Sequence, residues 1–156
     1  MGIVNADASN LKEWTDLAVL LFPESSFEAE FQFHQEILTS EKEIGYLYFL
    51  DNQYVGFMNI SIRSDYVNGT ETSPVVYIEA IYVLPEYRKK GIGQEFIQHA
   101  EAVARDRGIR EVASDCLIDN VLSEKFHKSC GFEEKERVIC FVKKVVKESV
   151  KERIEG

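Results

Sequence analysis

The chain of 156 residues has few of the features that mark secreted, metal-binding or membrane proteins. Its three cysteines, Cys116, Cys130 and Cys140, are isolated, and without a CxxC pair they predict neither a disulfide framework nor a zinc site. No apolar run approaches the roughly 18 residues of a membrane span, and no signal peptide is visible. We therefore expect a protein of the reducing cytoplasm that binds neither metal nor membrane.

Basic residues are also scarce, because 18 Lys and Arg stand against 27 Asp and Glu and leave a net charge of −9. The first 60 residues carry nearly all of this excess, with 10 acidic and 2 basic side chains. This balance argues against a protein that binds nucleic acid by neutralising phosphates, and it favours a cationic partner. A solvated acidic face explains the same charge without a partner.

The hydrophobic fraction of 45% and the aromatic fraction of 12% are sufficient for one hydrophobic core. Val75–Val83 is nearly continuous apolar sequence, broken only by Glu79, and predicts a strand that is buried on both faces. We expect a single α/β domain over 1–146 and a charged tail over 147–156. The expected order is helix 11–22, helix 27–38, strands Tyr46–Leu50, Tyr54–Ile62 and Val75–Val83, helix to about Arg107, strand Glu111–Ala113, helix Asn120–Ser129 and strand Val138–Val146.

The segment Arg88–Gly93 (RKKGIG) lies where the apolar strand gives way to the long helix. Its glycines let the backbone pass close to a ligand. The unpaired N–H groups of the first helical turn, together with the helix dipole, favour an anion at this position. A basic turn with glycines is often only a turn, but the physical inference here is a phosphate-bearing ligand.

An apolar strand followed by Arg-x-x-Gly-x-Gly resembles the GNAT family of acyl-CoA N-acyltransferases. Asn120, Phe126-His127 and Gly131-Phe132 resemble that family's second motif, and the resemblance covers roughly residues 3–146. It implies a GNAT fold, a mixed central sheet flanked by helices, with the cosubstrate acetyl-CoA in the splay between two central parallel strands. The cofactor-binding residues that it implies are Ile81, Tyr82, Val83, Arg88, Lys89, Lys90, Gly91, Ile92, Gly93, Gln94, Asn120 and Phe126.

Within the family, the segments Arg63–Gly93, Ala113–Asn120 and Glu134–Val138 resemble most closely the aminoglycoside 6'-N-acetyltransferases. The resemblance implies acetylation of a polycationic small-molecule amine, the basis of antibiotic resistance. Polyamines, protein N-termini, lysines and other small amines remain alternative acceptors. A non-catalytic regulatory domain that binds acetyl-CoA is a second class of alternative.

Two carboxylates are the candidates for amine chemistry. Glu79 interrupts an apolar strand, where a carboxylate is costly unless it is hydrogen-bonded or meets a charge. Asp115 follows the next predicted strand, and the ends of parallel strands line ligand crevices in open sheets. A buried acid that is paired with another side chain is the structural alternative for Glu79. The substrate-binding candidates are Tyr66, Glu71, Glu79, Asp115 and Glu136.

The reaction assigns a role to each catalytic candidate, Glu79, Asp115 and His127. An ammonium group must lose a proton before it can attack a thioester, and Glu79 can accept this proton directly or through water. Asp115 can orient the amine, and a backbone N–H near Ile81 can stabilise the oxyanion. His127 stands where the family usually has a Tyr that protonates the leaving thiolate, although it reads equally as a helix histidine without a catalytic role.

The segment after Phe132 predicts a partner chain. Some 14 residues leave little room for the two strands that the family fold places there, so one long strand is expected. A missing strand leaves an open sheet edge, which proteins normally cover. We therefore expect a homodimer in which the C-terminal strand pairs with its counterpart or is exchanged for it. A monomer with a short hairpin is the alternative.

Overall fold

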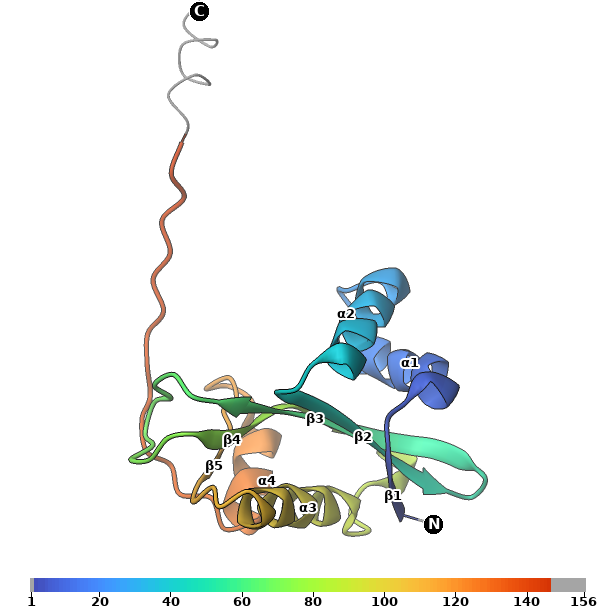
Figure 1. Ribbon diagram of the computed structural model, residues 1–156. Helices are drawn as coiled ribbons and strands as arrows, with labels where there is room; N and C mark the ends of the chain where they lie inside the picture. The colour runs from blue at the N-terminus through green and yellow to red at the C-terminus, as the bar shows by residue number, and fades with distance from the viewer. Residues whose placement is uncertain (1, 147–156) are drawn as a thin grey trace, which may run out of the picture.

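The computed structural model describes residues 2–146 and contains one five-stranded mixed sheet, in which the strands follow their order in the chain (Figure 1). Neighbouring strands β1 to β4 pair antiparallel, whereas β4 and β5 pair parallel. This confirms the predicted α/β architecture of a mixed sheet flanked by helices. The strands are β1 Gly2–Asn5, β2 Glu43–Leu50, β3 Gln53–Arg63, β4 Val75–Val83 and β5 Val112–Ala113.

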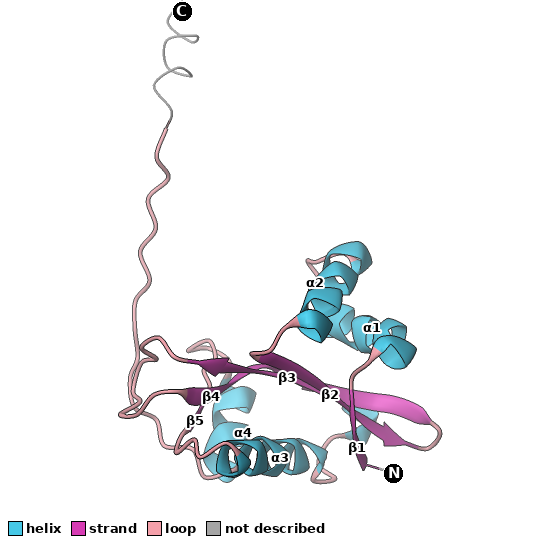
Figure 2. Ribbon diagram, viewed as in Figure 1, coloured by secondary structure: helices cyan, strands magenta, loops and turns pink. Residues whose placement is uncertain are grey.

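Helices cover both faces of the sheet, with α1 and α2 on one face and α3 and α4 on the other (Figure 2). Two short 3-10 helices, η1 Ala8–Asn10 and η2 Pro85–Tyr87, precede α1 and α3. The apolar spacing in the sequence predicts each of the four α-helices to within about two residues at either end. The helices are α1 Leu11–Leu21, α2 Phe27–Thr39, α3 Ile92–Asp106 and α4 Val121–Ser129.

Each face of the sheet has its own hydrophobic core. Under α3, the buried side chains of Phe96 and Ala100 pack against β3 and β4. Under α1 and α2, the fully buried Trp14 packs with Phe57 of β3 and stacks on His34 of α2 at a centroid distance of 3.8 Å. The two cores hold the sheet between the helix layers and fix the position of β4, which carries Glu79.

The hairpin of β2 and β3 turns at Asp51 and Asn52, where φ is 53° and 60°. Two successive positive φ angles define the tight turn that matches strand twist, as the Asp-Asn sequence predicts. β1 is absent from the sequence-based expectation, because four residues are too few to show an alternating pattern. It forms by pairing with β2, with Gly2 opposite Phe49.

The predicted last strand, Val138–Val146, is wrong for the single chain, since residues 133–146 adopt no regular secondary structure. This segment follows α4 and runs away from the body of the protein as an extended chain (Figure 1). A strand requires a partner for its backbone groups, and no described part of this chain pairs with the segment. Its apolar side chains are strongly exposed, with Phe141 at 88% and Val142 at 92%. The predicted tail 147–156 lies outside the described residues.

The sequence predicts that β4 is buried along its whole length, but only its first part is buried. Val75–Ile78 is buried, whereas Glu79 is exposed and Ala80–Val83 is half-buried. The reason is that β5 pairs with β4 only at Val76 and Tyr77, so the second half of β4 has an open edge. This separation of the two parallel strands creates the space that a ligand can enter.

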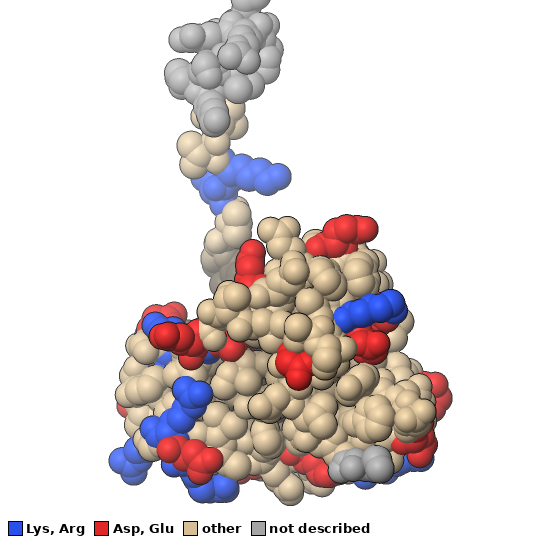
Figure 3. Space-filling model, turned by 45° about the vertical axis from the view of Figure 1, so that its right-hand side comes forward, with Lys and Arg blue, Asp and Glu red and all other residues tan. Residues whose placement is uncertain are grey.

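Within residues 2–146, no helix combines the length and the apolar character that a membrane crossing requires. On the face shown in Figure 3, acidic side chains are scattered over the surface and do not form one continuous patch.

Candidate active site

Glu79 is the extra residue of a β-bulge in β4. Asn59 of β3 lies opposite Ala80 and Ile60 lies opposite Ile78, so Glu79 has no residue opposite it. A bulge of this kind redirects a side chain and is common beside active sites. The Glu79 carboxylate projects into an open hollow on the α1–α2 side of the sheet, which Ser61, Arg63 and Asp65 also line.

Both oxygens of the Glu79 carboxylate accept hydrogen bonds from side chains of β3. Ser61 Oγ donates to Oε2 at 2.5 Å. Arg63 donates from Nε to Oε2 at 3.1 Å, and from Nη2 to Oε2 at 2.8 Å and Oε1 at 3.0 Å. The acid is therefore paired with another side chain, as the structural alternative for Glu79 requires, and it also faces the hollow that a substrate would enter.

Asp115 is connected to the same site through Tyr77. The Tyr77 hydroxyl donates to Asp115 Oδ2, and the Arg63 guanidinium carbon lies 3.7 Å from the centre of the Tyr77 ring. Burial, aided by the hydrogen bond to Asp115, raises the pKa of Tyr77 above its usual value. The phenol therefore stays protonated and donates to Asp115, while Arg63 on its ring face connects it to Glu79.

The open edge of β4 presents the backbone N–H of Ile81. N–H directions alternate along a strand. The Leu84 N–H donates to Val55 O of β3 at 2.8 Å, so the N–H groups of Ile81 and Val83 point to the opposite edge, toward the space beside β5. The bulge at Glu79 produces this direction by shifting the alternation by one residue. The Ile81 N–H thus points into the space between β4 and β5.

The start of α3 presents free backbone donors. Gly91 is the N-cap residue with φ of 87°, and no described side chain caps the helix. Arg88 donates from Nε to Val83 O at 2.8 Å and ties the loop to the end of β4, while Lys89 and Lys90 are exposed. First-turn donors, the dipole of a 15-residue helix and two exposed cations fit a pyrophosphate group.

α4 approaches the same helix start closely. A Cβ at Gly93 would lie 2.7 Å from the ring of Phe126, so only glycine allows this contact without displacing the ring. Asn120 caps α4, since its Oδ1 accepts from Ser123 N at 3.1 Å. Phe126 and Gly93 together bring the two helices to one side of the open β4 edge, which fits a bound pantetheine arm.

His127 is held at both ring nitrogens. Nδ1 lies 2.7 Å from the Ser123 carbonyl oxygen, which can only accept, so Nδ1 carries a proton. Nε2 lies 2.8 Å from Ser114 Oγ at the end of β5. A neutral ring accepts a hydrogen bond from this hydroxyl. Such a ring is well placed to join α4 to β5, and its use as an acid would require a second proton.

The loop that precedes β4 is anchored beside the carboxylates. Val67 is buried against Tyr77, which leaves the neighbouring Tyr66 72% exposed. Glu111 accepts hydrogen bonds from the backbone N–H groups of Glu71 and Thr72, with N···Oε1 distances of 3.0 and 2.7 Å. The hydroxyl of Thr72 lowers the pKa of Glu111.

The structure does not bring every predicted substrate residue to Glu79. Glu136 lies in the extended segment after α4 instead of in a strand, and its exposed side chain makes no hydrogen bond or ion pair with a described residue. Sequence reasoning missed Arg63 and Tyr77. Arg63 and Ser61 are two residues apart on a strand, a spacing that places both on one face, but only the register of β3 against β4 shows that they meet Glu79.

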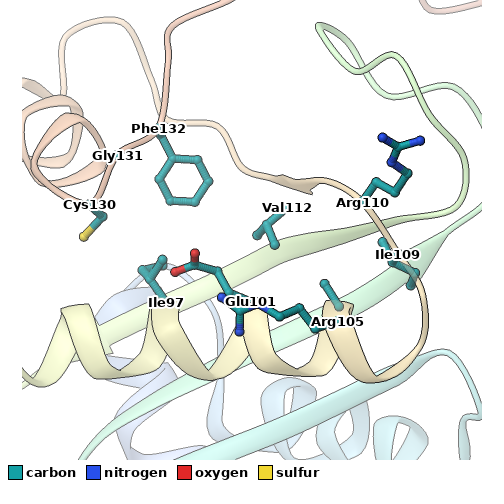
Figure 4. A pocket seen from close by; sticks show the side chains of 10 residues that line it. Ile97, Glu101, Arg105, Ile109, Arg110, Val112, Cys130, Gly131 and Phe132 are labelled. Atoms are coloured by element: carbon teal, nitrogen blue, oxygen red, sulfur yellow. The ribbon is translucent and has the colours of Figure 1, made fainter.

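A second hollow lies apart from Glu79, between α3, β5 and the end of α4 (Figure 4). Ile97 and Val112 form part of its apolar wall, and Glu101 and Arg105 add charge at its border. Cys130 lies there as well, and burial raises the pKa of its thiol. The hollow adjoins the edge of β5 that has no partner strand among the described residues.

Comparison with known proteins identifies the class. Residues 11–132 match the family described as Acetyltransferase (GNAT) family, and the chain belongs to this family. It resembles aminoglycoside N(6')-acetyltransferase type 1 of Acinetobacter haemolyticus, with 40% identity over 93% of this chain and 99% of the relative. The enzyme of the same name from Salmonella enteritidis is 37% identical, over 92% of this chain and 99% of the relative.

Solved structures agree with this grouping. AAC(6')-Iy, solved with a bisubstrate analogue of CoA and acetylneamine, has a TM-score of 0.88 at 36% identity and covers 92% of this chain and 97% of its own. AAC(6')-IG from Acinetobacter haemolyticus has a TM-score of 0.86 at 38% identity and covers 94% of this chain and all of its own. Within the GNAT family, this chain is most like the aminoglycoside 6'-N-acetyltransferases.

Proposed function

We propose that the protein transfers the acetyl group of acetyl-CoA to the 6'-amine of an aminoglycoside antibiotic. The observation that carries this proposal is the pair of carboxylates Glu79 and Asp115, which Tyr77 and Arg63 connect beside the open edge of β4. A polycationic amine needs such acidic partners, and the near full-length likeness to aminoglycoside N(6')-acetyltransferases supports the same substrate class.

The chain's own groups divide the work of direct transfer. Asp115 and Tyr66 hold the amine, and Glu79 accepts its proton directly or through water, which frees the lone pair. The Ile81 N–H stabilises negative charge that develops on the carbonyl oxygen. The N–H groups of the α3 start, with Lys89 and Lys90, hold the pyrophosphate. The nitrogen bonds to the carbonyl carbon of acetyl-CoA, the C–S bond breaks, and CoA leaves as a thiolate, so no acyl-enzyme is required.

A thiol-release assay with acetyl-CoA and a panel of amines tests this function. The panel contains kanamycin-type aminoglycosides, spermidine and peptides with free N-termini. We expect turnover with the aminoglycosides at a kcat/KM well above that for the other amines. Turnover restricted to spermidine or peptides would reassign the acceptor, and the absence of any turnover would leave a binding domain.

We also propose that the protein is a homodimer. The extended segment 133–146 exposes a run of apolar side chains that includes Ile139 and Phe141, and β5 has no partner strand on its outer edge among the described residues. Exposed apolar strands and open edges favour pairing with another chain. Strand exchange between two copies would cover both features. Sedimentation velocity at micromolar concentration should give a dimer, and a monomer would contradict it.

We place the protein in the cytoplasm, without a nucleic-acid or membrane partner. Its three cysteines are all free thiols, which suits a reducing compartment. Its net charge of −9 opposes binding to phosphate backbones and to anionic lipid. Fractionation of the source cells should recover the protein with the cytosolic fraction, and recovery with membranes or chromatin would contradict this.

A further inference from the structure

Arg63 occupies the position in which the proposed function places the substrate's ammonium group. Its Nη2 lies 2.8 and 3.0 Å from the two oxygens of Glu79, and its guanidinium lies 3.7 Å above the ring of Tyr77. Tyr77 in turn donates to Asp115. The cation therefore sits on the carboxylate and the aromatic face that would recognise any other cation there.

While this contact holds, the guanidinium neutralises Glu79 and leaves only one acceptor position free, on Oε1. Oε2 accepts from Ser61 and twice from Arg63, and Oε1 accepts from Arg63 as well. A carboxylate oxygen offers about two acceptor positions, so Oε2 is already oversubscribed. Because the guanidinium already neutralises Glu79, an incoming ammonium group must compete with it for the carboxylate.

The ion pair between Arg63 and Glu79 is exposed enough for another cation to replace Arg63. Its side chains are 36% exposed for Arg63 and 34% exposed for Glu79, and ion pairs open to solvent are weak enough to be replaced by an equivalent cation. Asp65 lines the same hollow as Arg63 and offers the displaced guanidinium another carboxylate.

We propose that Arg63 is an internal placeholder for the substrate cation, which neutralises Glu79 in the free enzyme and is displaced when the amine binds. Arg63 thereby lowers the affinity for every amine, because each amine must compete with the guanidinium for Glu79. Acceptors with several charges are favoured, because one ammonium group replaces Arg63 while the others add binding energy elsewhere. This role rests on the proposed function and adds a specificity-determining residue to it.

The test compares Arg63→Ala with Lys42→Ala, in the full chain and with saturating acetyl-CoA. Both variants remove one positive charge from the same hollow, but Lys42 makes no hydrogen bond or ion pair with Glu79. We expect Arg63→Ala to lower KM for a kanamycin-type aminoglycoside by about fivefold or more while kcat stays within about twofold. Lys42→Ala should change KM by less than about twofold, and Arg63→Lys, which keeps a competing cation, should lie between Arg63→Ala and the wild type.

Other outcomes overturn the placeholder role. A rise in KM, or a loss of kcat of about tenfold in Arg63→Ala, would show that Arg63 holds Glu79 permanently. An equal fall in KM in Lys42→Ala would show that the effect of Arg63→Ala comes from the lost positive charge in the hollow and not from the contact with Glu79. If aminoglycosides are turned over with the same KM by Arg63→Ala and the wild type, only the placeholder role fails. If neither protein turns over nor binds an aminoglycoside by calorimetry, the proposed function fails together with it.

Discussion

A single inserted residue, Glu79, gives β4 its candidate chemistry. The bulge turns the carboxylate toward Ser61 and Arg63 and also turns the Ile81 N–H toward the open edge. One local irregularity thus positions both the candidate proton acceptor and the candidate oxyanion donor in a single strand. Its neighbour across the splay, Asp115, contributes through the Tyr77 hydroxyl.

Replacing Glu79 and Asp115 by the corresponding neutral amides tests their proposed roles as proton acceptor and amine-orienting group. We expect Glu79→Gln and Asp115→Asn each to lower kcat/KM for the aminoglycoside by about 10²-fold or more, because one loses the proton acceptor and the other the charge that orients the amine. Steady-state kinetics with a fixed acetyl-CoA concentration measures both. Glu133→Gln, on the exposed segment after α4, is the matched control and should act as the wild type does. Unchanged rates in both site variants would remove the carboxylates from the mechanism.

His34 links stability to pH. It is fully buried between Trp14 and the β3 residue Asn59, and desolvation lowers its pKa from 6.5 to about 4. The unfolded chain therefore binds a proton that the folded chain excludes, and stability falls as the pH drops from about 6.5 to about 4. The full loss is about 3 kcal/mol from this group.

Urea unfolding at pH 7 and pH 5 checks this linkage. The wild type should lose more stability between these two values than His34→Gln, whose side chain does not titrate. The difference between the two pH slopes isolates His34 from the carboxylates, which both proteins share. Equal slopes would show that His34 titrates normally in the folded protein.

At the scale of elements, the loop between β3 and β4 depends on a residue outside it. Glu111 accepts two backbone N–H groups and the Thr72 hydroxyl, and so ties the loop to the start of β5. We expect Glu111→Ala to raise KM for the amine by about threefold to tenfold, because Tyr66 then loses its position. The affinity for CoA, measured by calorimetry, should not change.

Glu111→Gln provides the contrast, since its amide oxygen can still accept from the loop. It should retain most of the amine affinity that Glu111→Ala loses. An equal effect of the two variants would show that the negative charge of Glu111, and not the anchoring of the loop, controls amine binding.

The elements differ in how far their sequences predict them. Val75–Val83 is predicted to the residue, because a continuous apolar run has clear ends at Pro74 and Pro85. β1 is too short to show a pattern, and Val138–Val146 has strand composition without a partner strand among the described residues. Glu79 stands out as a carboxylate in an apolar run. Arg63 does not, because an arginine at a strand end is usually a surface residue and only the β3–β4 register reveals its contact.

At the scale of the whole molecule, the exposed segment after α4 carries the contact of the proposed dimer. Phe141 and Val142 are 88% and 92% exposed, which a second copy would cover. The double variant Phe141→Asp/Val142→Asp should sediment as a monomer at micromolar concentration, because it places charge in an apolar contact. Lys143→Glu changes charge on the same segment without removing an apolar side chain and should remain a dimer. A dimeric double variant would place the interface elsewhere.

The charged side chains of the molecule fall into two groups, which suit two different ligands. The chain carries −9, yet Arg88, Lys89 and Lys90 give an anionic cosubstrate a basic loop at the start of α3. The acids for which we propose a direct role, Glu79 and Asp115, lie outside the acid-rich first 60 residues. Net charge alone therefore indicates the cationic substrate but conceals the site of acetyl-CoA.

The position of the acetyl group in the product tests the central proposal most directly. The protein, acetyl-CoA and a kanamycin-type aminoglycoside are incubated together, and the product is assigned by NMR. We predict one acetyl group, on the 6'-amine, formed by the wild type and formed about 10²-fold more slowly by Glu79→Gln. Acetylation at another amine, or an aminoglycoside that is recovered unchanged, would contradict the assignment.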